Sequence, residues 1–255
     1  MTYTQYNPDG TCRAAADVMT DLAAIKDKGF TAIRMYGTDC NGLQNVGAGA
    51  RAAGLKIIVG VFIEASGIAA AQPQVAEIAS WGQSGNWDLV IMIVVGNEAI
   101  SSTYCDGPSL AAFISSARGS FQAAGSGSIP VTTSETVAAF VSNAGSLCGV
   151  IDVVAANIQT FFDGGVVAGD AGTFAQTLMG QIEAACPGKP SYNLESGWPS
   201  AGGDNNLSLA NPTAQAAAIA AINGLLGDKT VMFSFTDDAW KPPGVEQHFG
   251  CAQLF

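Results

Sequence analysis

Short apolar runs recur along the chain and alternate with segments in which apolar residues have a helical spacing. Two of the runs, DLVIMIVV at residues 88–95 and VIDVVAANI at residues 150–158, are almost continuously apolar. Such runs are typical of parallel strands that are buried on both faces of a sheet. The pattern predicts eight strands, at residues 2–6, 32–36, 56–63, 89–95, 129–133, 150–158, 191–194 and 230–235.

The segments between these strands place apolar residues three or four positions apart, as amphipathic helices do. Proline is favoured in the first turn of a helix, and glycine just after its last turn. We therefore expect helices to begin near Pro73, Pro108 and Pro212. Gly54 is expected to end the helix that precedes the third strand.

Strands that alternate with helices over about 250 residues favour a (β/α)₈ barrel, also called a TIM barrel. The alternative is an open, doubly wound sheet, but the number and even spacing of the strands favour the barrel. Only twenty residues follow the predicted eighth strand, so the eighth helix should be short or absent. No linker or low-complexity segment interrupts the pattern, and we expect residues 1–255 to form a single catalytic domain.

The composition excludes several classes of partner. Charged residues make up 12% of the chain, and the formal net charge is -11. Nucleic acids and anionic membranes are bound through clustered basic residues, so neither is expected as a partner. No apolar stretch reaches the length of about 20 residues that a membrane-spanning helix needs. His248 is the only histidine, so a histidine-rich metal site is excluded, and we expect no metal or cofactor.

Six cysteines are scattered along the chain, and no two of them form a CxxC motif. An even number of well-separated cysteines predicts up to three disulfides, with no free thiols, in an oxidising compartment. The alternative is six reduced cysteines in a cytosolic protein. Because an apolar-alternating strand pattern follows Met1 directly, we expect Met1 to stand where a secretory leader has been removed.

Two glutamates follow buried strands at the edge where a barrel carries its active site. Asn97 and Glu98 end the run VVGNE, and Glu195 lies in LESGWP after the seventh strand. Carboxylates on these nearly opposite strands can face each other across the barrel mouth. A pair about 5–5.5 Å apart is the arrangement of retaining glycosidases. The alternative is that each glutamate caps a helix or binds a loop amide.

The motifs VVGNE and ESGWP, in this order and about a hundred residues apart, resemble glycoside hydrolase family 17, in its fungal branch. IRMYGTDC, NIQTFFD and DDAWKPPGVEQHFG are similar to that family as well, so the resemblance extends from residue 2 to about residue 251. It implies a barrel fold and action on β-1,3-glucan with retention of configuration. It also implies that Glu98 is the general acid/base and that Glu195 is the nucleophile.

The resemblance implies roles for further residues. Asn97 is expected to hold a sugar 2-hydroxyl, and Tyr36 to orient the nucleophile unless it is only a core residue. Trp198 is expected to stack on a pyranose ring, with loop packing as the alternative. Phe162 is expected either to line the cleft or to pack in the core, together with its neighbour Phe161.

Asp238, Lys241 and Glu246 resemble a charged cluster beside the nucleophile, in which Lys241 would hold Glu195 ionised. The alternative is a surface salt-bridge group of little energetic value. The resemblance also implies a disulfide between Cys148 and Cys186.

These observations predict a secreted, cell-wall-directed enzyme that acts as a monomer on β-1,3-glucan or laminari-oligosaccharides. We expect a glucanosyltransferase with hydrolysis as a side reaction. The alternatives are a plain endo-β-1,3-glucanase, an enzyme that acts on another β-glucan, and a wall protein that binds β-glucan without cleaving it.

Overall fold

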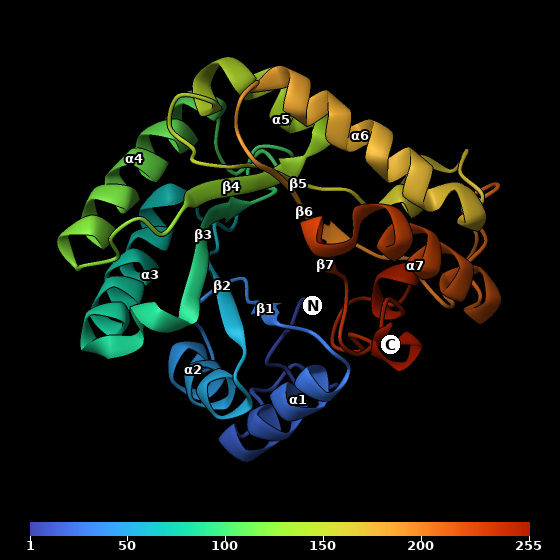
Figure 1. Ribbon diagram of the computed structural model, residues 1–255, viewed down its shortest axis with the longest axis horizontal. Helices are drawn as coiled ribbons and strands as arrows, with labels where there is room; N and C mark the ends of the chain where they lie inside the picture. Colours follow the sequence, from blue (N-terminus) through green and yellow to red (C-terminus); the bar gives the residue numbers. More distant parts are fainter.

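The computed structural model describes residues 1–255 and contains one sheet of seven parallel strands in the order β1 to β7. Helices surround this sheet, and the strands form the inner ring of the molecule (Figure 1). The strands are β1 (Ala32–Arg34), β2 (Lys56–Val61), β3 (Val90–Asn97), β4 (Val131–Thr136), β5 (Val154–Asn157), β6 (Ser191–Ser196) and β7 (Thr230–Met232). The helices are α1 (Ala15–Asp27), α2 (Gly42–Ala53), α3 (Ile68–Trp81), α4 (Gly107–Ala123), α5 (Val137–Leu147), α6 (Ala171–Ala185) and α7 (Pro212–Leu226).

The N-terminal segment takes the place of the predicted first strand. Thr2 donates a backbone hydrogen bond to Met232 of β7 (2.8 Å), and Tyr3 donates one to Arg34 of β1 (2.9 Å). The segment therefore lies between the first and last strands of the sheet and connects them. These contacts confirm the barrel-like alternation of strands and helices that the sequence predicts.

The predicted strand at residues 2–6 is wrong in its extent, because only Thr2 forms a bridge to β1. Beyond Tyr3 the chain turns back on itself, and Tyr6 pairs with Cys12 in an antiparallel bridge. Pro8, which lacks a backbone N–H, and the following aspartate and Gly10 favour this turn. Gly10 has a φ of 82°, in the left-handed region that glycine adopts most readily.

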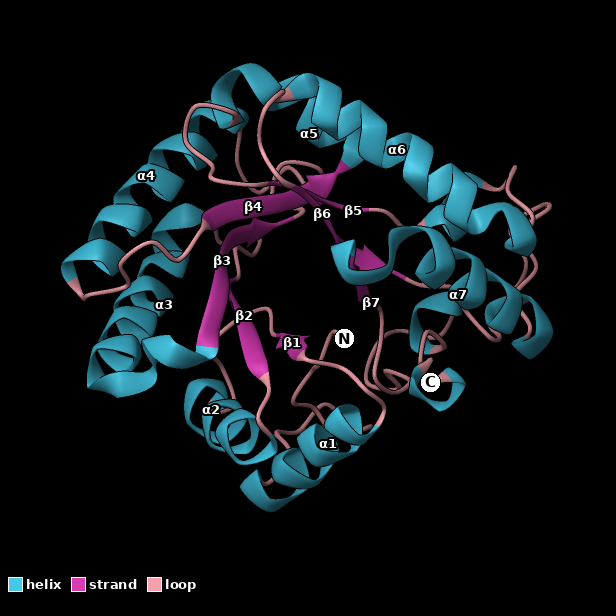
Figure 2. Ribbon diagram, viewed as in Figure 1, coloured by secondary structure: helices cyan, strands magenta, loops and turns pink.

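The end of the chain confirms that the eighth helix is short or absent. After β7 the chain forms only two 3₁₀ turns, at Val245–Gln247 and Ala252–Leu254 (Figure 2). Residues of this segment bond to the stretch that follows β7, since Ser234 donates to Phe249 and Cys251 donates to Ser234 (2.9 Å each). Pairing with this stretch fixes the C-terminal segment without a helix.

The prolines and glycine that punctuate the helices mostly act as predicted. Pro108 and Pro212 lie in the first turns of α4 and α7, and Gly54 ends α2 in the left-handed conformation. Pro73 is the exception, because it lies inside α3. This helix begins five residues earlier, after Gly67, whose φ of 80° marks the entry into the helix.

The barrel interior changes from apolar to polar along its axis. A small cluster fills one part of it, with the side chains of Ile58, Met92, Val94, Val153, Ala155 and Leu194. Toward the carboxyl ends of the strands, the buried side chains are polar or charged and include Arg34, Asn157 and Glu195. Burying such groups is costly unless they bond to one another, so the polar end is built as a network.

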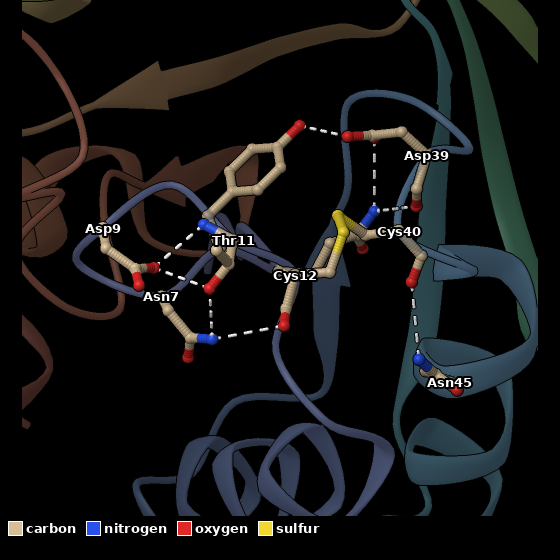
Figure 3. The surroundings of a disulfide bond; sticks show 9 residues. Asn7, Asp9, Thr11, Cys12, Asp39, Cys40 and Asn45 are labelled. Carbon is tan, nitrogen blue, oxygen red and sulfur yellow. Dashed lines mark hydrogen bonds between the residues drawn. A yellow bond between two sulfur atoms is a disulfide. The ribbon is translucent and has the colours of Figure 1, made fainter.

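Two disulfides are formed. Cys148–Cys186 joins the ends of α5 and α6, as the resemblance implies, and Cys12–Cys40 joins the N-terminal turn to the loop before α2 (Figure 3). The expectation of no free thiols is wrong, because Cys105 and Cys251 are unpaired. Cys105 follows β3, whereas Cys251 is buried against the stretch after β7, so their positions in the barrel keep them from pairing.

Candidate active site

A cavity of about 1230 Å³ lies at the carboxyl ends of the strands. Residues from the N-terminal segment and from the ends of β1 to β7 line it, including Asn97, Glu98 and Glu195. The two predicted catalytic carboxylates therefore share one cavity. This is the face on which barrel enzymes carry their active sites.

Glu195 is in strand β6 and is only 7% exposed. Its Oε1 atom forms an ion pair with the Arg34 guanidinium at 3.0 Å. The side-chain amide of Gln159 lies 3.5 Å from Oε2 on the other side of the carboxylate. The Arg34 guanidinium therefore supplies a positive charge in direct contact with this buried carboxylate, and a buried carboxylate needs such a partner.

Glu98 follows directly after β3 and has a φ of 51°. Residues other than glycine adopt this left-handed conformation rarely, and often at functional sites. Its carboxylate accepts a hydrogen bond from the neutral amide of Asn157 at 2.9 Å. Burial, followed by the negative charge of Glu195, raises the pKa of Glu98 above its usual range. Glu98 is thus the carboxyl group of the pair that is favoured to keep a proton.

Arg34 connects the two carboxylates through the polar end of the barrel. Besides Glu195, it donates to the Leu194 carbonyl (2.6 Å), to Asn97 Oδ1 (2.7 Å) and to Asn157 Oδ1 (3.3 Å). Asn157 in turn donates to Asn97 at 3.0 Å, in addition to its bond to Glu98. Sequence reasoning did not single out Arg34 or Asn157. A lone arginine in the apolar strand AIRMY was the available signal for the first of them.

Asn97 is the last residue of β3 and lines the cavity. Its Oδ1 atom is held by Arg34 and Asn157, and its amide nitrogen forms no hydrogen bond within the protein. The amide N–H groups are therefore available to a ligand in the cavity.

Tyr36 lines the cavity beside the Arg34 guanidinium, which lies 4.7 Å from the centre of its ring. Its hydroxyl has no hydrogen-bond partner within the protein. Burial, and then the charge of Glu195, raises the pKa of this phenol well above its usual range. A neutral, unpaired hydroxyl next to Glu195 is placed to donate a hydrogen bond to that carboxylate or to a ligand.

The three predicted charged residues lie together at the cavity wall. The Lys241 ammonium forms ion pairs with Asp238 at 3.3 Å and with Glu246 at 3.4 Å. The expected pairing of Lys241 with Glu195 is not formed, and Arg34 occupies that position instead. Lys241 lies over the Phe233 ring at 4.7 Å, so its contacts keep it at the wall.

Of the three aromatic residues Phe161, Phe162 and Trp198, one lines the cavity and two lie in the core. Phe162 lines the cavity and is 47% exposed, whereas Phe161 is buried. The expected stacking of Trp198 on a sugar ring is wrong, because its side chain is fully buried. Trp198 packs edge-on against Phe161, with ring centroids 5.3 Å apart, and donates to the Leu209 carbonyl at 2.8 Å.

A third carboxylate, Glu135 of β4, lies beneath the loop that carries Glu98. It is completely buried and accepts hydrogen bonds from the backbone N–H groups of Ile100 (3.0 Å) and Ser101 (3.2 Å). Burial raises the pKa of Glu135 to about 7. Sequence reasoning missed this residue, because TTSET carries no motif that separates a loop anchor from an exposed glutamate.

The cavity thus combines one carboxyl group whose pKa is raised with one that is paired to a cation. Such a pair can supply an acid and a nucleophile to the same bond. No group of three or more histidine, cysteine, aspartate or glutamate side chains is arranged to hold a metal ion. None of the helices has the length and apolar character needed to cross a membrane.

The sequence model of the BtgE/BtgC glycoside hydrolase domain matches residues 1–250. The chain is 47% identical over 258 residues to "Probable beta-glucosidase btgE" of Aspergillus fumigatus, and 41% identical over 263 residues to the protein of the same name from Emericella nidulans. Both alignments cover 100% of this chain, but they cover only 45% and 47% of the two relatives. The chain therefore spans less than half the length of the relatives that it matches.

Two solved structures share the fold at low sequence identity. A glycoside hydrolase family 17 β-1,3-glucanosyltransferase from Rhizomucor miehei superposes with a TM-score of 0.87 at 22% identity, over 98% of this chain and 91% of that one. An endo-laminarinase from Formosa gives a TM-score of 0.85 at 15% identity, over 98% and 81%. At these identities the likeness establishes the fold, which agrees with the barrel described above.

Proposed function

The chain belongs to the BtgE/BtgC glycoside hydrolase domain family, and on that premise we propose that it is a retaining enzyme on β-1,3-glucan. The observation that carries this proposal is the asymmetry of the two carboxyl groups. Arg34 contacts Glu195 directly, while burial and the charge of Glu195 raise the pKa of Glu98. Retaining glycosidases need this difference between a nucleophile and an acid.

In the first step, the Glu195 carboxylate attacks the anomeric carbon of the glucosyl residue at the bond to be cleaved. Glu98 gives its proton to the departing glycosidic oxygen, so the leaving chain departs as an alcohol. A covalent glucosyl ester on Glu195 and an ionised Glu98 remain. Arg34 stays bonded to the Glu195 side of the site, and the free amide N–H of Asn97 faces the cavity, where it can hold a sugar hydroxyl.

In the second step, Glu98 removes a proton from an acceptor hydroxyl as that hydroxyl attacks the ester. Glu195 leaves as a carboxylate, and the configuration at the anomeric carbon is retained. The acceptor is another glucan chain in transfer, or water in hydrolysis. We propose that transfer predominates, because cavity-lining residues extend from the β1 side to the β4 and β5 side, beyond the carboxylates in both directions. This leaves room for a donor and an acceptor at once.

We also propose that residues 1–255 act as one catalytic domain, as a monomer, on wall glucan outside the cell. The two disulfides support an oxidising location. All the residues of the site come from one chain, so no second copy is needed to complete it. The net charge of -11 supports a neutral substrate rather than a nucleic acid or an anionic lipid surface.

The proposal is tested by incubating the protein with laminari-oligosaccharides of defined length and following the product sizes by mass spectrometry. Products longer than the substrate are expected, together with a smaller amount of shorter ones. Early products of a hydrolytic turnover should carry the β-anomeric configuration by NMR. Only shorter products would favour the endo-glucanase alternative. A folded protein that binds the oligosaccharides without changing them would favour the glucan-binding alternative.

A further inference from the structure

The active-site cavity has an aromatic wall that the proposed reaction does not use. Tyr6 of the N-terminal turn and Trp240 of the segment after β7 both line the cavity. No hydrogen bond or ion pair connects either side chain to Glu98 or Glu195. Tyr6 precedes β1 and Trp240 follows β7 in the sequence, and their rings are in contact. This wall is therefore built where the N-terminal and C-terminal segments of the barrel meet at the cavity.

The rings of Tyr6 and Trp240 pack against each other, and part of their surface is exposed. Their ring centroids are 4.9 Å apart, with an angle of 60° between the ring planes. Trp240 is 36% exposed and is the most exposed of the four tryptophans, whereas the exposed surface of Tyr6 is smaller. The Lys241 ammonium lies 5.7 Å from the centre of the Trp240 ring, and the rest of the exposed indole surface faces the cavity that holds the reactive carboxyl groups.

Hydrogen bonds fix both rings in place. The Trp240 indole N–H donates to Asp238 at 3.1 Å, and the Tyr6 hydroxyl donates to the Asp39 carboxylate. Asp39 is itself held, because Gln5 donates to its backbone carbonyl at 2.5 Å and to its Oδ1 atom at 3.3 Å. An aromatic surface that is fixed before binding loses little conformational entropy when a ligand packs on it.

A disulfide holds the turn that carries Tyr6 and the neighbouring loop that carries Asp39. The Cys12–Cys40 bond joins the turn that follows Tyr6 to the residue next to Asp39, and Figure 3 shows this bond between the two loops. Within the turn, Asn7 donates a backbone hydrogen bond to the Thr11 carbonyl at 2.7 Å. The cross-link thus constrains two cavity-lining loops that contribute none of the catalytic carboxyl groups.

We propose that Tyr6 and Trp240 form a sugar-stacking subsite, shaped by the Cys12–Cys40 disulfide, for a glucosyl residue remote from the cleaved bond. The C–H face of a pyranose buries apolar surface on the indole ring, and its hydroxyls can donate to carboxylates in the same part of the cavity, such as Asp39 and Glu64. The subsite rests on the proposed function, because it takes the same glucan that the carboxylates cleave.

The subsite makes binding depend on oligosaccharide length. Chains too short to reach from the carboxylates to Trp240 gain nothing from it. Chains that reach it gain the stacking contact, and we expect their affinity to rise about tenfold at that length, which is typical of one buried aromatic contact.

The experiment uses the full chain with Glu195→Gln, so that ligands bind without being consumed. Laminari-oligosaccharides of two to six units are titrated by calorimetry, and tryptophan emission is recorded in parallel. We expect a step in affinity at one length, accompanied by a change in emission and by protection of the emission from an added quencher. Adding Trp240→Phe should remove the emission change, and adding Trp240→Ala should remove the affinity step.

Two further variants and a control complete the test. Tyr6→Ala and the double substitution Cys12→Ser/Cys40→Ser should each reduce the same step, because they release the position of the wall. Trp87→Phe is the matched control. Trp87 lies outside the cavity and donates to the Ala124 carbonyl at 2.8 Å, so its replacement should leave both the step and the emission change in place.

The outcomes separate the subsite from the proposed function. An affinity step that persists in folded Trp240→Ala and Tyr6→Ala proteins, or an emission change that Trp87→Phe removes instead, would overturn the subsite alone. If wild-type protein turns over the oligosaccharides but Glu195→Gln shows no length step, the subsite is again overturned and the function stands. If no oligosaccharide is bound or turned over, both fail together.

Discussion

Glu98 and Glu195 are chemically identical side chains in one cavity, yet they differ in the group that each carboxylate contacts and in the backbone that carries it. Glu195 is part of strand β6 and contacts the guanidinium of Arg34 at 3.0 Å. Glu98 lies one residue beyond β3, in a left-handed backbone conformation, and its carboxylate contacts a neutral amide of Asn157. A cation is paired with one carboxylate, and burial raises the pKa of the other.

The comparison also shows that the two environments depend on each other. The charge of Glu195 is one of the causes that raise the pKa of Glu98, while the charge of Arg34 acts in the opposite direction. In the proposed reaction, the charge of the nucleophile therefore helps the acid to hold its proton. In that reaction, Glu195 loses its charge when it becomes an ester, so Glu98 would be easier to ionise at the stage when it acts as a base.

The largest effect is expected from removing the proposed nucleophile. Glu195→Gln has no anionic oxygen to form the glycosyl ester, so turnover of laminari-oligosaccharides should fall by at least about 10⁴-fold. Glu195→Asp keeps the charge but moves the carboxylate away from the substrate by the length of one methylene. A displacement of this size typically lowers the rate by about 10²-fold. Rates are measured by mass spectrometry of products, with circular dichroism to verify folding. Near-normal turnover by folded Glu195→Gln would contradict the assignment.

Glu98→Gln should distinguish the acid from the nucleophile. General acid catalysis contributes about 10²–10⁴-fold, and only when the leaving group needs a proton. The variant should therefore lose about this factor on laminari-oligosaccharides, but far less in the first step on an aryl β-glucoside with an acidic phenol as its leaving group. The two substrates in a single variant serve as each other's control. Equal losses on both, measured by burst kinetics, would mean that Glu98 is not the acid.

Much of the fold was predictable because apolar runs report burial directly. The strands from β1 to β7 all lie at or beside their predicted runs, and the missing eighth helix follows from the short C-terminal segment. The prediction failed at residues 2–6, where a turn at Pro8 overrides an alternating pattern. It also failed at Pro73, since a proline can lie inside a helix when Gly67 supplies an earlier start.

The site was predictable only where a reactive residue directly follows a strand. Glu98 and Glu195 have that position, and the barrel geometry brings such residues to one edge. Arg34 acts through contacts with residues 123 and 160 positions away, and Asn157 through a contact with Glu98 that is 59 positions away, which no local pattern reports. The burial of Trp198 depends on the same kind of long-range packing, so its predicted stacking role was wrong.

Replacing Arg34 should weaken the difference between the two carboxyl groups. Arg34→Met leaves Glu195 buried without its cation, and breaking a buried ion pair typically costs about 3–5 kcal/mol of stability. Because the charge of Arg34 lowers the pKa of Glu98, its removal should raise that pKa further and move the alkaline limb of the pH–rate profile to higher pH. Arg34→Lys keeps the positive charge, so the alkaline limb of its pH–rate profile should stay closer to that of the wild-type protein than the limb of Arg34→Met does. Denaturant unfolding and pH–rate profiles measure the two effects, and an unchanged or lowered alkaline limb in Arg34→Met would contradict this account.

The smallest effect is expected at Glu135, which supports the loop of Glu98 from below. Its folded-state pKa is raised from 4.5 to about 7, so between these values the folded protein holds a proton that the unfolded chain has lost. Stability should therefore fall as the pH rises through this window, by about 3 kcal/mol in total, and level off above it. Glu135→Gln cannot lose a proton, so its unfolding free energy should lack this slope. Subtracting the two denaturant profiles removes the parts that both proteins share, including most of the contribution of Glu98. If the two proteins gave parallel profiles, Glu135 would have the same pKa in the folded and the unfolded state. The hydrogen bonds from the Ile100 and Ser101 amides would then offset the effect of burial on that pKa in full.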